Sequence, residues 1–227
     1  MKIIAIILAR GNSKGILNKN IINFCGKPLI AWTIEHCIKG GLNDVYVSSD
    51  SNKILSISSS YGAQTIKRPS NLSNDKATSE SGLKHALKII EKKIGTVDWV
   101  VTPQVTSPIR SPKDIKSVVQ LCESGGFDSL FSVIRIEDHF IWKQDSIGNL
   151  NSLNYDFRNR KRRQEIEDKY LENGSLYVFR PYVLRKENNR LGGVISIYEM
   201  EKHKMFQIDN QEDLELCTVI MKGYGYC

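Results

Sequence analysis

The stretch Ile3-Ile-Ala-Ile-Ile-Leu8, which runs directly into Ala9-Arg-Gly-Asn-Ser-Lys-Gly15, decides the fold of this chain. Six consecutive apolar residues before a basic, glycine-containing segment predict a buried first strand followed by a long turn. The run is too short for the apolar core of a signal peptide, and no small-residue cleavage site follows it. We therefore interpret it as the first strand of a sheet and not as a targeting segment.

Strands and helices alternate along the chain beyond this first strand. Residues 97–101 are apolar except for Asp98, which indicates a strand buried on both faces of a parallel sheet. Leu83, Ala86, Leu87 and Ile90 repeat at helical spacing, which predicts one buried helix face. The succession predicts an α/β fold with a doubly wound, mostly parallel (Rossmann-like) sheet, whose ligands gather at the carboxyl ends of the strands. Further strands are expected at 45–49, 63–66, 129–134 and 176–179, and further helices from Pro28, Ser51 and Pro112 and after the cap Asn210.

The regular alternation breaks between residues 135 and 170. This stretch is polar, contains a candidate hairpin turn at Ser146-Ile-Gly-Asn149, and includes the basic tract Arg158-Asn-Arg-Lys-Arg-Arg163. We expect one domain over residues 1–227, with 135–170 as an arm inserted into it.

Composition and charge narrow the classes of function. Of the 227 residues, 41% are hydrophobic and 25% are charged, which excludes a disordered protein or a disulfide scaffold. Five cysteines without a C-x-x-C pair favour reduced thiols and a cytoplasmic location. No apolar run approaches the ~20 residues of a membrane span, so no membrane partner is expected. The net charge of +7 favours an anionic partner, but no nucleic-acid-binding module is recognisable, so phosphorylated small molecules are preferred over nucleic acid.

The loop after the first strand has the composition of a phosphate-binding loop. It lacks the Gly-Lys-Ser/Thr ending of a P-loop and the G-x-G-x-x-G spacing of a dinucleotide loop. Gly11 and Gly15 permit close approach of the backbone, and Arg10, Lys14 and Lys19 neutralise negative charge. By spacing alone, an ordinary basic loop explains the pattern equally well.

Several motifs recur in one order along nearly the whole chain. Residues 9–31 read ARGNSKGILNKNIINFCGKPLIA, and they resemble the opening of the acylneuraminate cytidylyltransferases, which include the CMP-sialic acid synthetases and their relatives for other nonulosonic acids. The resemblance continues at Ser48-Ser-Asp50, Arg68-Pro-x-x-Leu72, Asp75-x-Ala-Thr-Ser, Gln104-x-Thr-Ser-Pro108, Arg163-Gln164, Glu172-Asn-Gly174 and Ile208-Asp209-x-x-Glu-Asp-Leu214.

The resemblance implies both a fold and a reaction. The fold is the nucleotide-diphospho-sugar transferase type with a small dimerisation arm, so a homodimer is expected. In the reaction, the anomeric hydroxyl of the sugar acid attacks the α-phosphate of CTP in line, and a CMP-sugar and pyrophosphate form with Mg²⁺ as cofactor. Two alternatives remain: a nucleotidyltransferase for a related ulosonic acid such as Kdo, and a non-catalytic nucleotide- or nucleic-acid-binding protein.

Residue roles follow from the resemblance position by position. Catalytic roles are implied for Arg10, Lys19 and Asp209. Nucleotide binding is implied for Ala9, Arg10, Gly11, Asn12, Lys14, Lys19, Asn20, Arg68 and Ser81. Sugar binding is implied for Gln104, Thr106, Arg163, Gln164, Asn173 and Gly174.

The expected metal site departs from the family's pattern. Many members carry Asp-x-Asp before the last helix, whereas this chain has Gln207-Ile-Asp209. Mg²⁺ keeps several waters and needs only one or two carboxylates besides substrate phosphates, so Asp209 is expected as the principal ligand. Asp50 is expected either to assist it or to cap the helix that follows.

Overall fold

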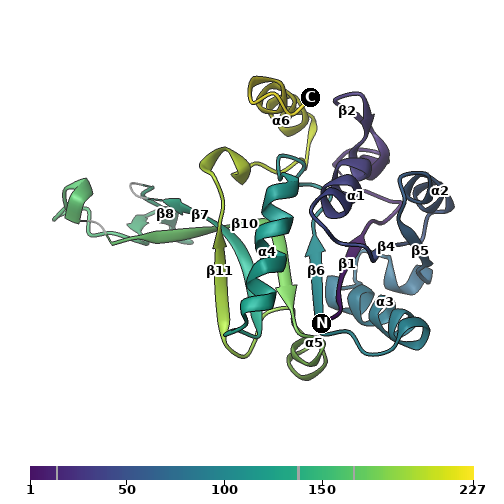
Figure 1. Cartoon of the computed structure of the whole chain (residues 1–227). Helices are drawn as coiled ribbons and strands as arrows, with labels where there is room; N and C mark the ends of the chain where they lie inside the picture. Colours follow the sequence, from purple (N-terminus) through teal and green to yellow (C-terminus); the bar gives the residue numbers. More distant parts are fainter. Residues whose placement is uncertain (14, 137–138, 166) are drawn as a thin grey trace.

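The computed structural model describes residues 1–13, 15–136, 139–165 and 167–227. Its body is built on a seven-stranded sheet with the order β11-β7-β10-β6-β1-β4-β5 (Figure 1). The strands are β1 (Ile3–Leu8), β4 (Val45–Ser49), β5 (Gln64–Lys67), β6 (Trp99–Pro103), β7 (Ser129–Ile136), β10 (Lys169–Phe179) and β11 (Ile195–Glu199).

The sheet is mostly parallel, as expected. β1 pairs in parallel with β4 and β6, β4 pairs in parallel with β5, and β11 pairs in parallel with β7. β10 runs antiparallel to both of its neighbours. Because β1, β4, β5 and β6 point the same way, the loops that leave their carboxyl ends meet at one edge of the sheet.

Helices cover both faces of the sheet. Along β1, Ala5 and Ile7 face a core shared with α1, α2, α4 and α6, whereas Ile4 and Ile6 face a second core shared with α3 and α5. This alternation confirms the doubly wound arrangement. The helices are α1 (Leu29–Lys39), α2 (Asn52–Ser60), α3 (Ser79–Ile94), α4 (Pro112–Ser124), α5 (Pro181–Glu187) and α6 (Gln211–Gly223). Short turns of 3₁₀ helix lie at η1 (Lys19–Ile21), η2 (Ser70–Leu72), η3 (Arg163–Glu165) and η4 (Lys202–Met205).

In the described part of the chain, no helix has the length and apolar character needed to cross a bilayer.

Helix boundaries follow the capping residues that the sequence contains. The Ser51 hydroxyl accepts from Ile54 N at 3.4 Å, so α2 begins one residue later than expected. Pro112 occupies the first turn of α4, as predicted. Asn210 and Asp213 form a reciprocal capping box at the start of α6, which confirms the predicted cap.

Strand boundaries were predicted less well. The strand expected at 97–101 lies at Trp99–Pro103, because the amides of Asp98 and Trp99 bond to Lys2 O and pairing begins with Ile3 opposite Trp99. The last predicted strand, 176–179, extends back to Lys169, because 169–172 pair with β7 across a register shift. The short helix α5 and the edge strand β11 had no predicted counterpart.

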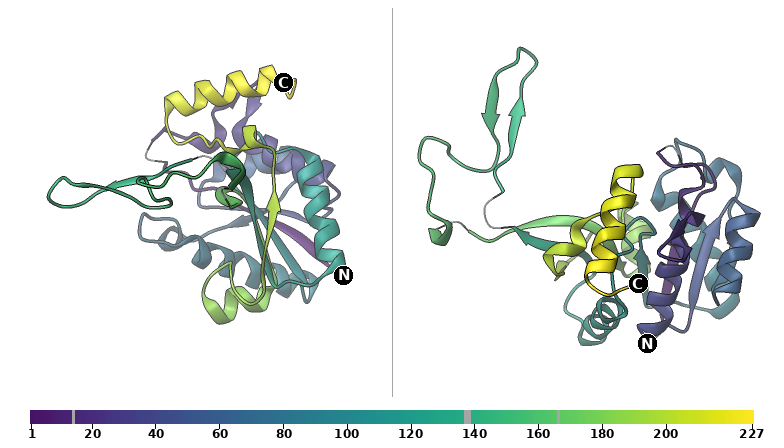
Figure 2. Two further views of the ribbon diagram at one scale, coloured as in Figure 1. Left: turned by 90° about the vertical axis from the view of Figure 1, so that its left-hand side faces the viewer. Right: turned by 90° about the horizontal axis from the view of Figure 1, so that it is seen from above.

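An arm leaves the body between β7, which ends at Ile136, and β10, which begins at Lys169, within the stretch 135–170 that we expect to be inserted. It carries a hairpin of β8 (Trp142–Gln144) and β9 (Leu150–Ser152), and Figure 2 shows it projecting away from the sheet. The amide of Asp145 donates to Asn149 O at 2.9 Å, so the predicted turn at 146–149 is confirmed. A second small hairpin, β2 (Asn23–Phe24) and β3 (Lys27–Pro28), precedes α1.

Three of the five cysteines, Cys37, Cys122 and Cys217, are buried in the core, Cys25 is half-buried and Cys227 is exposed. Burial raises the pKa of the Cys37 and Cys122 thiols to about 12. These thiols therefore stay protonated near neutral pH and act as small apolar groups, as the sequence indicated.

A buried ion pair joins η4 to α4. Lys204 Nζ lies 2.9 Å from Asp114 Oδ2, and both side chains are 2% exposed. Asp114 also accepts from Ser111 N at 2.7 Å and from Tyr198 OH at 3.1 Å. Burial by itself would raise the pKa of Asp114, but the hydrogen bonds from Lys204 and Ser111 outweigh it and lower the pKa. The carboxylate is therefore charged in the folded protein.

Asp114→Asn is expected to destabilise the protein by about 3 kcal/mol at pH 7, because it leaves Lys204 with one buried partner fewer. The folded pKa of Asp114 lies below its unfolded value, so its contribution is complete above about pH 4 and is lost as pH falls through the folded pKa. Urea unfolding followed by circular dichroism from pH 7 to 3 measures this. The wild type should lose stability toward low pH more steeply than the variant, while Asp156→Asn on the exposed arm should behave as wild type. Parallel pH curves for wild type and Asp114→Asn would contradict the assignment.

Candidate functional site

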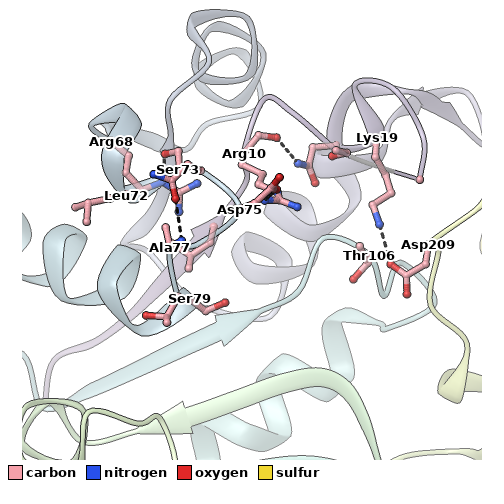
Figure 3. A pocket seen from close by; sticks show the side chains of 16 residues that line it. Arg10, Lys19, Arg68, Leu72, Ser73, Asp75, Ala77, Ser79, Thr106 and Asp209 are labelled. Carbon is pink, nitrogen blue, oxygen red and sulfur yellow. Dashed lines mark hydrogen bonds and ion pairs between the residues drawn. The ribbon is translucent and has the colours of Figure 1, made fainter.

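A cavity of about 620 Å³ opens at the carboxyl edge of the sheet, where ligands were expected (Figure 3). Its walls come from the loop after β1, the segment from Arg68 to Ser79, the loop after β6 and the residues before α6. The lining is mainly polar and includes Arg10, Lys19, Asn20, Arg68, Asp75, Thr106 and Asp209.

The loop after β1 is held in place from several sides. Ala9 N donates to Ser48 O at 3.1 Å, and Asn20 Nδ2 donates to Arg10 O at 2.9 Å. Gly11 N donates to Asp50 Oδ1 at 2.9 Å. The loop therefore presents the Arg10 side chain from a fixed backbone, and Ala9, Gly11 and Asn20 act mainly by shaping it.

Position 15 must be glycine for a steric reason that the sequence alone did not reveal. A Cβ at this position would lie 2.0 Å from the backbone oxygen of Asp209. A side chain cannot be accommodated there without moving backbone, so glycine lets the loop pack directly against the segment before α6. The close backbone approach that Gly15 permits is therefore to Asp209 of the same chain.

Lys19 and Asp209 are far apart in sequence but bond to each other on one wall of the cavity. Lys19 Nζ donates to Asp209 Oδ1 at 2.8 Å and to Ile208 O at 2.9 Å. The Lys19 side chain is 13% exposed, whereas the Asp209 side chain is 70% exposed. The predicted catalytic lysine is thus held inside the wall, and the carboxylate faces the opening.

Two arginines bring positive charge to the same cavity. Arg10 Nη1 pairs with Asp75 Oδ1 at 3.0 Å, and both side chains are substantially exposed. An exposed pair of this kind contributes little to stability, so a phosphate can replace the carboxylate at small cost. Arg68 is 5% exposed and donates through Nε to Ser73 Oγ at 2.9 Å. Burial lowers the pKa of Arg68, and the nearby Asp50 partly opposes this.

The start of α3 also faces the cavity, through Thr78 and Ser79. Helix amino termini carry exposed N–H groups and partial positive charge, which favour phosphate. Ser81, the predicted ligand in this helix, lies outside the lining. Its backbone N–H donates to the hydroxyl of Thr78, the N-cap of α3, at 3.2 Å, and its own hydroxyl donates to Thr78 O at 2.7 Å, so both groups bond within the first turn of the helix.

The predicted sugar-contacting residues divide into two groups. Thr106 lines the cavity. Gln104 lies at the start of the same loop, and its backbone N–H donates to Ser175 O at 3.0 Å. Asn173 is 2% exposed, and its side chain bonds to Ser132, Met200 and Lys204 O. The side-chain amide of Asn173 therefore ties β10 to β7 and η4, and the contact of Asn173 with the sugar stays a prediction.

Arg110 is a supporting residue that sequence reasoning missed, although it lies only two residues after the Gln104-x-Thr-Ser-Pro108 motif. It is 2% exposed and donates to Ser175 O at 2.9 Å and to Thr33 Oγ1 at 3.1 Å. Burial lowers the pKa of Arg110 to about 10, so it remains charged at neutral pH. It holds the loop that presents Thr106.

Asp50, which was expected to assist the metal or to cap a helix, contacts the loop after β1. Asp50 accepts from Gly11 N, and Ser51 caps α2 in its place, so Asp50 positions the loop. Among the described residues, no three His, Cys, Asp or Glu side chains cluster as a metal site. The exposed Asp209 carboxylate fits Mg²⁺ chemistry, which can use one carboxylate together with substrate phosphates and water.

The remaining predicted residues are less closely connected to the cavity. Asn12 is an exposed loop residue outside its lining, and Lys14 lies outside the described residues. Arg163 and Gln164 belong to η3 on the arm, and Gln164 is exposed outside the cavity lining.

Comparison with known proteins identifies the family. A family model described as cytidylyltransferase matches residues 4–222. The chain belongs to the cytidylyltransferase family. It is 33% identical over 226 residues to N-acylneuraminate cytidylyltransferase A of Danio rerio, covering 98% of this chain and 51% of that protein. It therefore spans about half the length of such relatives. It is 29% identical to the pseudaminic acid cytidylyltransferase of Campylobacter jejuni, covering 98% of this chain and 97% of that protein.

Solved cytidylyltransferase structures share the fold. CMP:2-keto-3-deoxy-manno-octonic acid synthetase, solved with CTP, superposes with a TM-score of 0.71 at 17% identity, covering 99% of this chain and 100% of that one. The 4-diphosphocytidyl-2C-methyl-D-erythritol synthase of Anaerococcus prevotii gives a TM-score of 0.66 at 13% identity, covering 97% and 98%. These likenesses confirm the predicted fold, a mostly parallel central sheet with flanking helices, which this chain shares with solved cytidylyltransferases.

Proposed function

We propose that this chain transfers CMP from CTP to a nonulosonic acid of the sialic-acid type and releases pyrophosphate. The observation that carries the proposal is the Lys19–Asp209 ion pair in the wall of a cavity that is also lined by Arg10, Arg68 and the start of α3. The similarity to N-acylneuraminate and pseudaminic acid cytidylyltransferases supports a nine-carbon acid as the acceptor. The likeness to the octonic acid synthetase concerns the fold and keeps Kdo as the alternative acceptor.

The cavity's cations account for the chemistry. The triphosphate would lie among Arg10, Lys19, Arg68 and the amino terminus of α3. The anomeric hydroxyl attacks the α-phosphorus, the bond from that phosphorus to the oxygen bridging to the β-phosphorus breaks, pyrophosphate leaves with the bond's electron pair, and the hydroxyl proton passes to solvent water. Negative charge grows on the non-bridging and leaving oxygens, and fixed cations in a partly closed site stabilise it. Lys19, held by Ile208 O and Asp209, is preorganised for this role.

Asp209 is the residue that would hold Mg²⁺. Its carboxylate is exposed to the cavity, and one of its oxygens already accepts from Lys19. The bound ion would neutralise phosphate charge. Lys19 and Asp209 would then share the task of orienting the phosphates, which a single carboxylate alone could not do.

We infer a homodimer that forms through the arm. The arm exposes a cluster of aromatic side chains: the ring of Phe140 lies 4.2 Å from that of Tyr155, and the ring of Trp142 lies 5.2 Å from that of Phe157. Trp142 is 42% exposed and Leu150 is 63% exposed, which favours burial against a second copy. In such a dimer, Arg163 and Gln164 would reach the cavity of the partner subunit. The cytoplasmic location stays a prediction.

Pyrophosphate release tests the proposed function. The chain is incubated with CTP, Mg²⁺ and one acid at a time: a sialic, legionaminic or pseudaminic acid, or Kdo. We expect release that depends on both CTP and sugar and is fastest with a nine-carbon acid. Fastest release with Kdo would establish the alternative acceptor. CTP binding by calorimetry without release for any acid would favour a non-catalytic nucleotide-binding protein, and the lack of CTP binding would contradict both.

A further inference from the structure

Gln207 connects two walls of the site. Its Nε2 group donates to Asn173 O, on the irregular part of β10, at 2.8 Å. Its Oε1 atom accepts from Thr106 Oγ1 in the loop after β6 at the longer distance of 3.4 Å. One side chain therefore links the loop after β6, strand β10 and the segment that enters α6.

The backbone beside Gln207 carries the same connection to Asp209. Ile208 N donates to Thr106 O at 2.8 Å, and Ile208 O accepts from Lys19 Nζ at 2.9 Å. Asp209 follows immediately and bonds to the same lysine. A displacement of Gln207 would therefore shift both Thr106 and Asp209, which line the cavity.

The surroundings of Gln207 require an amide. Gly174 has φ +63°, and a Cβ there would lie 2.4 Å from Gln207 Nε2, so the amide packs directly against this backbone. A glutamate of the same shape would place a carboxylate oxygen where Nε2 meets the carbonyl oxygen of Asn173. Two acceptors at that distance repel each other, and the buried carbonyl would lose its donor.

We propose that Gln207 is a positioning residue: it fixes Thr106 and Asp209 on the cavity wall, and it does so as a hydrogen-bond donor that a glutamate of the same shape cannot replace in this chain. Thr106 lines the cavity and uses its hydroxyl as a donor to Gln207 Oε1, so its oxygen can still accept from a hydroxyl of the acceptor sugar. The contact stands on the geometry alone, whereas its kinetic consequence rests on the proposed function.

The test compares Gln207→Glu with Gln211→Glu. The control makes the same chemical change on the exposed surface of α6, where Gln211 bonds to Glu215. Hydrogen–deuterium exchange read by mass spectrometry should become faster in peptides that cover 104–108 and 205–210 for Gln207→Glu only. The Tm of Gln207→Glu should fall by about 4 °C. Turnover should fall on the order of tenfold to a hundredfold in kcat, with the Kd for CTP within about threefold of wild type.

A double-mutant cycle with Thr106→Val separates positioning from general stability. If Gln207 acts through Thr106, the second substitution should lower kcat/KM for the sugar much less in Gln207→Ala than in wild type. Independent losses, or a kcat of Gln207→Glu within twofold of wild type, would overturn the positioning role. If both peptides of Gln207→Glu exchanged at the wild-type rate, the contacts assigned to Gln207 would be overturned. Absence of turnover in wild type with faster exchange in Gln207→Glu would reject the proposed function and leave the connection in place.

Discussion

Lys19→Met is expected to lower kcat for CMP transfer by ~100- to 1,000-fold, the usual cost of removing one preorganised donor from an active site. Lys19 is 13% exposed and holds a fixed position through Ile208 O and Asp209 Oδ1. Methionine retains most of the apolar stem, but it cannot neutralise charge on the phosphates. Because the proposed position of the triphosphate places the lysine beside it in the ground state as well, the Kd for CTP should rise by about tenfold. Steady-state kinetics and calorimetry measure the two effects separately.

The matched control is Lys53→Met on the exposed surface of α2. It removes the same charge from the chain and should leave kcat and the Kd for CTP within about twofold of wild type, as is usual for surface sites. Lys19→Arg should recover little activity, because the larger guanidinium does not fit a wall that leaves the lysine only 13% exposed. A Lys19→Met enzyme with wild-type kcat would rule out this lysine as the charge-stabilising group.

Asp209→Asn is expected to lower kcat by at least ~100-fold and to remove most of the response to Mg²⁺. The amide retains the shape of the side chain, and Asp209 N can still donate to Asp213 Oδ2, which is 2.9 Å away, so the start of α6 should persist. What is lost is the charge that pairs with Lys19 and faces the cavity. In wild type, chelation of Mg²⁺ by EDTA should abolish turnover, and its return should restore it.

Calorimetry adds a readout that does not depend on turnover. Mg²⁺ should tighten CTP binding clearly in wild type and only weakly in Asp209→Asn, because the ion would lose its protein ligand. Glu212→Gln, three residues along the chain and exposed on α6, is the control and should respond to Mg²⁺ as wild type does. An equal response to Mg²⁺ in wild type and Asp209→Asn would mean that the ion is held elsewhere.

The order of secondary structure was predictable because it depends on local patterns. Apolar runs identified β1 and β4, and the side chains of Ser51, Pro112 and Asn210 marked helix starts, since a cap acts within a few residues of itself. The edge strand β11 was missed, because its residues are only partly buried and its pairing with β7 depends on a partner more than sixty residues away.

The sequence proposes members of the site, whereas the contacts among them needed the tertiary structure. Resemblance to known motifs named Lys19 and Asp209, but it could not show that they bond to each other. It also assigned Asn173 to the sugar, whereas burial turns that side chain into the protein. The sequence contains Gly15 without revealing that Asp209 O leaves no room for a Cβ there.

By itself, the sequence determined the alternation of strands and helices, the basic loop and the family, because these depend on residue types and their spacing. Tertiary structure alone decided which distant side chains share a wall of the cavity. Lys19, Thr106, Gln207 and Asp209 come together because the parallel strands β1 and β6 end at one edge of the sheet and the segment before α6 crosses that edge. Such contacts depend on long-range packing, and no local pattern in the chain encodes their distances.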